Sequence, residues 1–200
     1  MSAGFARIGR PVAGARSPLR LICPPVPTIQ LSQVEVYVFR RRGRRVEFLA
    51  LRRARHRRLL PGVWQPVTGK RRRGERSLAA TAREVFEETG LRPRRWWALE
   101  TVTLYLDAAQ ERLVVLPLFA AEVGPDEGVR LSKEHDAFAW LGARAAGKRY
   151  LWESQRRALE AVRREVLRGD PLASALEVTE RMSKAGARRP RRAAPRRRST

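Results

Sequence analysis

The sequence is poor in cysteine, histidine and lysine, and it has no long apolar run. Its one cysteine, Cys23, cannot form an internal disulfide and has no metal ligand near it, which suits a reducing cytoplasm. No segment approaches the roughly 18 uninterrupted apolar residues of a membrane-spanning helix. Two hundred residues, 43% of them hydrophobic, are enough for one domain with a real core. We therefore expect a single cytoplasmic domain with no membrane partner.

Arginine dominates the charge. The formal net charge is +23, only four of the 43 basic residues are lysine, and all 20 acids lie between the two ends of the chain. Residues 1–34 hold four arginines and no acid, and residues 184–200 hold eight basic residues and no acid. The excess of arginine over lysine has two explanations. It reflects the codon composition of a GC-rich genome and a solvated surface, or it serves weak nucleic-acid association through the tails.

Three regions follow from composition. Residues 1–28 mix Gly, Pro, Ser, Ala and Arg without periodicity, which predicts a flexible basic extension, an early start codon or a weak transit peptide. Residues 184–200 alternate arginine clusters with Ala and Pro, which predicts disorder. Residues 29–183 form the expected domain.

Within that domain the patterns predict a mixed β-sheet packed by helices. Alternation from Val34 and a run from Val46 to Leu51 predict a hairpin, and Pro117 marks an edge or a bulge. Further strands are expected at 63–68, 99–106, 113–123 and 138–141. Helices are expected at 77–89 and from about 151, with a third within 171–183.

The helix from Ser77 to Thr89 carries the chemistry. At 100° per residue, Glu84, Glu87 and Glu88 share an arc of roughly 100°. The opposite face, which we expect to be buried, carries Leu78, Ala82, Val85, Phe86 and Thr89. We expect Ser77 to cap the helix and Gly90 to end it in a left-handed conformation.

Three neighbouring carboxylates repel one another, so something should compensate them. A hard divalent cation does so, because Mg²⁺ prefers oxygen ligands and is held by carboxylates together with substrate phosphates. Arg83 flanks the acidic arc and can orient a carboxylate. On the helix alone, an ordinary solvated acidic face is an equally simple interpretation.

The spacing of residues around this helix decides between a cation-binding face and an ordinary solvated one. Gly69 and Glu75 are separated by five residues, and seven more precede the run Arg83 to Leu91. This pattern resembles the Nudix box with every defining position filled. Seven fixed identities and two aliphatic positions arise by chance at on the order of 10⁻⁸ per starting point.

The resemblance implies an α/β/α sandwich around a mixed sheet and a magnesium-dependent hydrolase of phosphoanhydrides, with Mn²⁺ as the alternative ion. By position, the implied metal ligands are Glu84, Glu87, Glu88 and Glu134, and the implied catalytic residues are Arg83, Glu87 and Glu134. Glu75 corresponds to an accessory acid. The backbone carbonyl of Gly69 or Lys70 corresponds to a further ligand.

Three stretches outside the box resemble the bacterial dihydroneopterin triphosphate pyrophosphatases. They are Trp64 to Gly69, Ser132 to His135 with Ala139 to Leu141, and Trp152 with Gln155 to Glu160. In this alignment Glu134 supplies a carboxylate from a loop, with Glu111 and Glu122 as weaker substitutes. The stretch from Leu106 to Leu113 is shorter than in those enzymes, which leaves pterin recognition open.

On the substrate side we expect Arg52, Arg53 and Trp64, by phosphate binding and ring stacking, although a core position for Trp64 is the simpler alternative. We expect His56 and His135 to face solvent, and Trp140 and Trp152 to lie in the core. The predicted reaction splits a nucleoside or pterin triphosphate into a monophosphate and pyrophosphate. The alternatives are an RNA-end or dinucleoside-polyphosphate hydrolase, and a non-catalytic ligand-sensing or nucleic-acid-binding module. The oligomeric state stays open.

Overall fold

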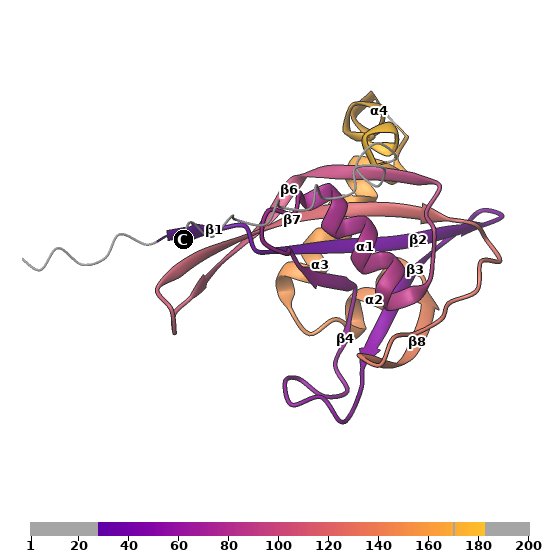
Figure 1. The fold of residues 1–200 in the computed structure, drawn as a ribbon. Helices are drawn as coiled ribbons and strands as arrows, with labels where there is room; N and C mark the ends of the chain where they lie inside the picture. The colour runs from indigo at the N-terminus through magenta and orange to yellow at the C-terminus, as the bar shows by residue number, and fades with distance from the viewer. Residues whose placement is uncertain (1–27, 170, 183–200) are drawn as a thin grey trace, which may run out of the picture.

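An eight-stranded mixed sheet runs through the computed structural model, which describes residues 28–169 and 171–182 (Figure 1). The strands are β1 (Thr28–Gln30), β2 (Gln33–Arg42), β3 (Arg45–Arg53), β4 (Trp64–Gln65), β5 (Val67–Lys70), β6 (Arg95–Asp107), β7 (Arg112–Val123) and β8 (His135–Leu141). The helical segments are α1 (Ser77–Thr89), α2 (Ala143–Arg149), α3 (Glu153–Val162), the π-helical η1 (Arg163–Leu167) and α4 (Pro171–Leu176). The predictions for Cys23 and for the two tails lie outside the described residues.

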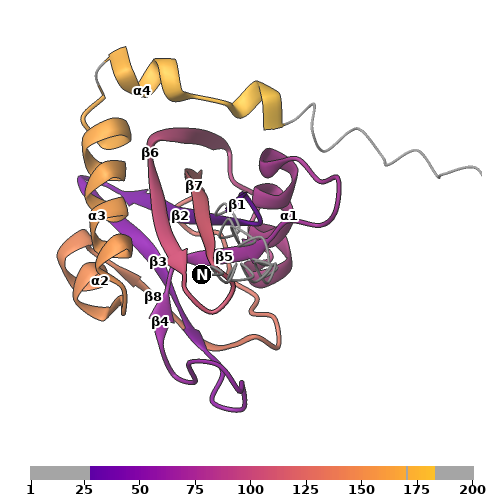
Figure 2. The same cartoon turned by 90° about the vertical axis from the view of Figure 1, so that its left-hand side faces the viewer.

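The sheet separates two hydrophobic cores. Strand β2 lies at its centre, parallel to β7 and antiparallel to β3 and β5. Its alternating residues divide between the cores: Val34, Val36 and Val38 join the one beside α1, and Tyr37 and Phe39 join the one beside α2 and α3. Figure 2 shows the strands between α1 on one side and α2 and α3 on the other. The predicted α/β/α sandwich is confirmed.

Several predicted elements change their bounds. The strand expected at 63–68 is split into β4 and β5 at Pro66, which has no N–H for a ladder. Strands β6 and β8 begin four and three residues before the positions expected, at Arg95 and His135. Helix α2 was not predicted, and the helix expected within 171–183 covers Pro171–Leu176.

Pro117 lies beside a β-bulge, as one of the two predictions for it required. The register between β6 and β7 shifts between Ala98 and Val102, which pair with Phe119 and Pro117. Three residues of β6 therefore face one of β7. The backbone N–H groups of Glu100 and Thr101 donate to the Glu165 carboxylate at 2.9 and 3.5 Å. Glu165, only 1% exposed, reaches them from η1.

The two tryptophans expected in the core behave differently. Trp140 is half-buried against the core beside α1, with the Arg40 guanidinium 4.4 Å from its ring centroid. Trp152 is 53% exposed, so its core assignment is wrong. It precedes α3 as the N-cap residue. Within the described residues, none of the helices has the length and apolar character needed to span a membrane.

Candidate functional site

Helix α1 and the β5–α1 loop (residues 71–76) hold five of the predicted site residues, namely Glu75, Arg83, Glu84, Glu87 and Glu88. The helix has the predicted bounds, Ser77–Thr89. Its N-cap is Arg76 rather than Ser77, and no side chain caps it, so that part of the prediction is wrong. Gly90 ends the helix at φ 70°, and its N–H donates to the Phe86 carbonyl at 2.8 Å. A left-handed glycine there is as predicted.

The acidic face of α1 is not uniformly exposed. The Glu87 side chain is 46% exposed, whereas Glu88 as a residue is 6% exposed and Phe86, expected in the core, is 39% exposed. The reason lies outside the helix. The N–H of Ser132 donates to the Glu88 carbonyl at 3.1 Å, and that of Arg130 to the Thr89 carbonyl at 2.8 Å. The β7–β8 loop (residues 124–134) therefore covers the C-terminal turn at Glu88.

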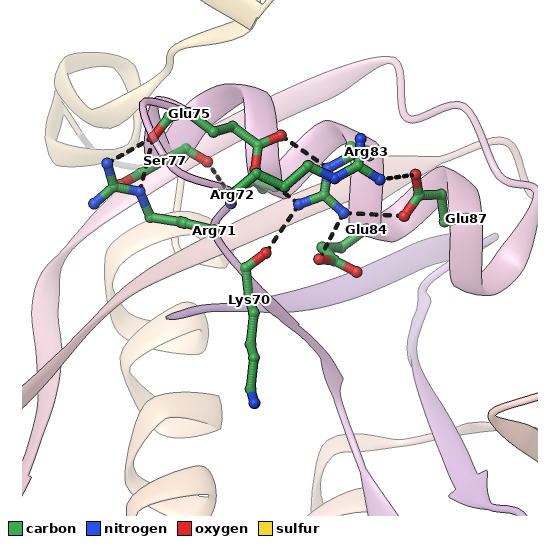
Figure 3. A network of polar contacts seen from close by, with 9 residues as sticks. Lys70, Arg71, Arg72, Glu75, Ser77, Arg83, Glu84 and Glu87 are labelled. Atoms are coloured by element: carbon green, nitrogen blue, oxygen red, sulfur yellow. Dashed lines mark hydrogen bonds and ion pairs between the residues drawn. The ribbon is translucent and has the colours of Figure 1, made fainter. Parts of the chain in front are cut away.

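Arg83 is the centre of a satisfied polar network (Figure 3). Its Nε and Nη2 donate to the two carboxylate oxygens of Glu75, both at 2.8 Å. Its Nη1 donates to Glu84 at 2.7 Å and to Glu87 at 2.9 Å, and Nη2 also donates to the Lys70 carbonyl at 2.9 Å. This is the predicted orienting role. The Lys70 carbonyl, one of two predicted backbone ligands, is occupied by Arg83.

The network sets the ionisation of its members. Hydrogen bonding to Arg83 lowers the pKa of Glu75, and hydrogen bonding to Glu75 raises the pKa of Arg83. Glu84 differs, because burial, together with the negative charges of Glu87 and Glu75, raises its pKa despite the hydrogen bond from Arg83. Glu75 therefore serves as the anionic anchor of the guanidinium, and Glu84 is a carboxylate that its surroundings have not fully compensated.

Gly69 has a packing role that explains its place in the pattern. A Cβ atom built at this position would overlap the Glu84 side chain, which lies directly against the glycine backbone. Strand β5 and α1 can approach only because position 69 has no side chain. The approach brings the Glu84 carboxylate to the end of the sheet, where Gly69 and Glu84 line the same cavity.

Glu88 and His135 form the unsatisfied part of the site. His135 Nδ1 lies 3.9 Å from Glu88 Oε2, and neither atom has a hydrogen-bond partner within residues 28–169 and 171–182. Burial raises the pKa of Glu88, helped by the negative charges of Glu84 and Glu134. Burial lowers the pKa of His135 to about 4, so the imidazole is neutral at neutral pH and does not form an ion pair. His135 is 5% exposed, which makes the solvent-facing prediction wrong; His56 is exposed, as predicted.

Glu134 lies across the cavity from α1. Its carboxylate is paired with Arg57 Nη2 at 3.3 Å, and its carbonyl accepts the N–H of Ala54 at 2.9 Å. The side chain is 49% exposed. Glu134 contributes to the electrostatic environment of Glu88, as expected of a carboxylate arriving from a loop. The two weaker candidates do not line this cavity: Glu111 occupies the β6–β7 turn and Glu122 is paired with Arg41.

One cavity of about 740 Å³ joins these groups. Acidic residues of α1 and Glu134 line it together with Arg53, Arg57 and Lys70. The wall also includes Gln33, Leu59, Leu60, Thr68, Tyr105 and Ser132, none of which was predicted. Leu59, Leu60 and Tyr105 have no distinctive sequence signal, because they come from a loop and from an exposed strand. His135 has no such signal either, because the register between β3 and β8 shifts between Arg52 and Arg53, which pair with Ala137 and His135, and simple alternation from Ala137 assigns His135 to the wrong face.

The predicted substrate residues divide at the end of β3. Arg53 lines the cavity, and its Nε donates to the Leu59 carbonyl at 3.0 Å. Arg52 points to the other face of the strand, where it pairs with Asp136 at 2.6 Å. Trp64 packs against the core beside α3, with Arg149 4.6 Å from its ring centroid, and it does not line the cavity. Arg53 is thus the predicted substrate residue that the fold brings to the acids.

The carboxylates fit a divalent cation by their chemistry. In the part of the chain that the structure describes, no three His, Cys, Asp or Glu side chains converge closely enough to hold an ion as they stand, because Arg83 draws Glu84 and Glu87 toward itself. Yet among the described residues Glu88 keeps a buried oxygen without a partner, and the negative charges of Glu84 and Glu134 raise its pKa further than burial alone. A cation among them would remove both penalties.

Two relatives match a large part of the chain. A segment of 144 residues is 35% identical to an octanoyltransferase of Myxococcus xanthus, covering 68% of this chain and 36% of that protein. A segment of 99 residues is 32% identical to the asymmetrical bis(5′-nucleosyl)-tetraphosphatase of Rattus norvegicus, covering 48% of this chain and 67% of that protein. The chain thus spans about a third of the first relative and two thirds of the second.

Solved structures agree on the fold. An Ap4A hydrolase from C. elegans has a TM-score of 0.56 at 21% identity, over 66% of this chain and 94% of that one. The dihydroneopterin triphosphate pyrophosphohydrolase of E. coli has a TM-score of 0.54 at 23% identity, over 68% of this chain and 96% of that one. Identities this low show the shared fold and not the predicted closeness to the pterin enzymes. The model of the NUDIX domain matches residues 31–162, and the chain belongs to that family.

Proposed function

We propose that this protein is a divalent-cation-dependent hydrolase that cleaves a phosphoanhydride bond of a nucleoside polyphosphate. One observation carries the proposal. Four carboxylates, those of Glu84, Glu87, Glu88 and Glu134, line a single cavity together with Arg53 and Arg57. Acids that can hold a cation and arginines that can hold phosphate oxygens are the two requirements for binding a polyphosphate next to a metal. The family supports the predicted enzyme class.

The ion would be held by Glu84, Glu87, Glu88 and Glu134, with the Gly69 carbonyl as a further ligand. Mg²⁺, or Mn²⁺ in its place, would neutralise the charge that develops on the phosphoryl oxygens and make bound water more acidic. Arg83 keeps Glu84 and Glu87 oriented by donating to both from one nitrogen. Because Glu75 holds the other edge of the guanidinium, Arg83 cannot follow a carboxylate that moves. Arg83 therefore keeps the carboxylates of Glu84 and Glu87 in a fixed orientation relative to each other.

Glu134 is our candidate for the general base. Its half-exposed carboxylate can take a proton from an attacking water and release it to solvent, whereas Glu88 is enclosed. Arg57 contacts the same carboxylate at 3.3 Å, so its guanidinium can hold that group in position at the edge of the cavity. Glu87, 46% exposed at the other side of the acidic group, is the alternative base. Arg53 and Arg57 would bind the phosphates beyond the scissile bond.

Two substrate classes follow. A dinucleoside polyphosphate is favoured by the rat relative, a bis(5′-nucleosyl)-tetraphosphatase, and by a cavity of about 740 Å³ in which Arg53 and Arg57 lie beside the acids. A nucleoside or pterin triphosphate, cleaved to a monophosphate and pyrophosphate, is the alternative from the sequence. A small-molecule substrate and a cytoplasmic protein remain part of this proposal, as does weak nucleic-acid association through the basic tails.

A substrate panel tests the proposal. The purified chain would be incubated with Mg²⁺ and, in turn, Ap4A, the nucleoside triphosphates, dihydroneopterin triphosphate and a 5′-triphosphate RNA, and the products separated by ion-exchange chromatography. We expect release of ATP and AMP from Ap4A, faster than pyrophosphate release from any triphosphate. Faster pyrophosphate release would move the assignment to the second class. No turnover with any of them, in Mg²⁺ or Mn²⁺, would leave a ligand-sensing module as the better interpretation.

A further inference from the structure

Three of the five buried side-chain atoms without a hydrogen-bond partner, counted over the described residues, lie together. They are Glu88 Oε2 and the two ring nitrogens of His135. The others, on Trp97 and Arg112, lie on the sheet away from the cavity. Buried polar groups are nearly always paired, so an acid and an imidazole left unpaired side by side call for an explanation. The explanation must involve both residues.

The backbone around this pair is fixed. The Glu88 carbonyl accepts the N–H of Ser132 at 3.1 Å, and the Ser132 carbonyl accepts the N–H of His135 at 3.3 Å. His135 is also in register with Arg53 across β3 and β8. Helix α1 and the start of β8 are thus joined through a single residue. These bonds hold the Cα atoms of Glu88 and His135 in place, so only their side-chain torsion angles are left to close the gap.

The remaining gap is small. The distance from His135 Nδ1 to Glu88 Oε2 is 3.9 Å, and a hydrogen bond to a carboxylate needs about 2.8 Å. Side-chain rotation alone can cover about 1 Å. A neutral imidazole carries its proton on either nitrogen, so an Nδ1–H donor is available without any change of charge. A carboxylate that binds a cation through one oxygen is held more firmly when its other oxygen accepts such a bond.

We propose that His135 is a positioning residue for Glu88: its Nδ1–H donates to the enclosed Oε2 and leaves Oε1 directed into the cavity, toward a divalent cation. The inference rests on the proposed function, because it gives Glu88 the role of a metal ligand. It assigns His135 no contact with substrate and no proton transfer. An alternative role as a simple core residue leaves three buried polar atoms unpaired and gives the imidazole nothing that a leucine would not provide.

Binding of Mn²⁺ alone tests this inference, measured without substrate from the electron paramagnetic resonance signal of the free ion. His135→Asn keeps an N–H donor close to the position of Nδ1, and His135→Leu removes it at similar volume. We expect His135→Leu to weaken Mn²⁺ binding by about 10- to 100-fold and His135→Asn by less than about threefold. His56→Leu, on the exposed loop, is the matched control and should bind as the parent does. Melting curves in EDTA check that each variant is folded.

Each outcome has a meaning. Parental Mn²⁺ affinity in a folded His135→Leu variant overturns the inference, and so does equal weakening in the Asn and Leu variants, since packing would then explain the loss. A parent chain that binds no Mn²⁺ overturns it as well. Because no substrate is present, the result is separate from the substrate panel. Loss of Mn²⁺ affinity on removing the donor would support the inference even if no phosphoanhydride were hydrolysed.

Discussion

The two ends of the acidic group on α1 differ in how well they are satisfied. Around Arg83, the carboxylates of Glu75, Glu84 and Glu87 share one guanidinium, and every nitrogen of that group donates at 2.7 to 2.9 Å. One turn further on, Glu88 has an enclosed oxygen with no partner and a neighbour, His135, with two more unpaired atoms. The same helix thus contributes to one satisfied network with the preceding loop and to one unpaired contact with β8.

The difference separates structural from chemical use of the same residue type. A carboxylate with a lowered pKa, such as that of Glu75, contributes to stability when it is ionised. A carboxylate with a raised pKa, such as that of Glu88, is costly to ionise until a cation arrives. We expect substitution of Glu75 or of its partner Arg83 to lower the free energy of unfolding, and substitution of Glu88 to reduce mainly activity. Three experiments would break or sharpen that contrast.

The largest effect should come from Glu88→Gln. We expect turnover with Mg²⁺ to fall by at least about 100-fold, because a cation contributes several kcal/mol to the stabilisation of the phosphoryl transition state. In EDTA at pH 8, the same variant should resist urea as well as the parent chain or better, since a buried negative charge is removed. Glu160→Gln, on an exposed turn of α3 with a side chain 62% exposed, is the control for both assays. A Glu88 variant that is inactive because it unfolds would contradict the contrast.

A smaller effect, of the opposite kind, is expected for Arg83→Lys. Lysine keeps the charge but not the planar fork that holds Glu75 with two bonds. Since the Arg83 side chain is only 16% exposed, we expect a loss of about 2 kcal/mol in the free energy of unfolding, read from urea denaturation. Arg95→Lys is a matched control, because Arg95 also donates two hydrogen bonds to one carboxylate, that of Glu177, and its side chain is 51% exposed. Its cost should stay below about 1 kcal/mol.

The smallest effect, on the order of 1 kcal/mol, is a difference in how the free energy of unfolding depends on pH. With its pKa lowered, Glu75 contributes stability that is present above pH 4.5 and is lost as pH falls through the folded pKa. With its pKa raised, Glu88 adds a penalty that grows as pH rises above 4.5. Because the pKa of His135 is lowered, this residue reduces the free energy of unfolding as pH falls from 6.5 to about 4.

Urea midpoints in EDTA across pH 3.5 to 8 would measure these opposed slopes. Glu75→Gln should flatten the acid side of the profile, and Glu88→Gln the neutral side. If both substitutions flattened the same side, the two carboxylates would not be under opposite electrostatic control. The window between pH 4 and 6.5 also contains His135, so the comparison is read from the differences between each variant and the parent chain.

The sequence predicted the parts of the site that depend on spacing along the chain. The positions of Gly69, Arg83 and Glu84 relative to one another follow from one loop and one helix, and they are as expected. The side chains that the helical projection misplaced, Glu88 and Phe86, depend on what covers the helix. A projection describes only the turning of α1 itself, and the β7–β8 loop that encloses Glu88 begins more than 30 residues later in the chain.

Tertiary pairing explains the other differences. Arg52 and Arg53 are the same residue type, so the sequence does not distinguish them. The alternation of side chains along β3 places Arg52 beside Asp136 and Arg53 in the cavity. His135 was taken for a loop residue because β8 was expected to begin at Phe138. Helix α2 (Ala143–Arg149) is short and has one buried residue, Ala146, so its sequence carries almost no amphipathic signal.

The Glu165 contact described with the fold makes two irregularities depend on each other. The extra residues in β6 expose two backbone N–H groups, and the π-helical turn η1 places a nearly inaccessible carboxylate where it receives them. Removing the strand insertion alone would take the β6 amide donors away from the buried Glu165 carboxylate and leave it to Arg164, and straightening the helix alone would leave those amides unpaired. Insertions and deletions here should therefore be tolerated only in pairs, so a change of length in β6 must be matched by a change of helical pitch some 65 residues later.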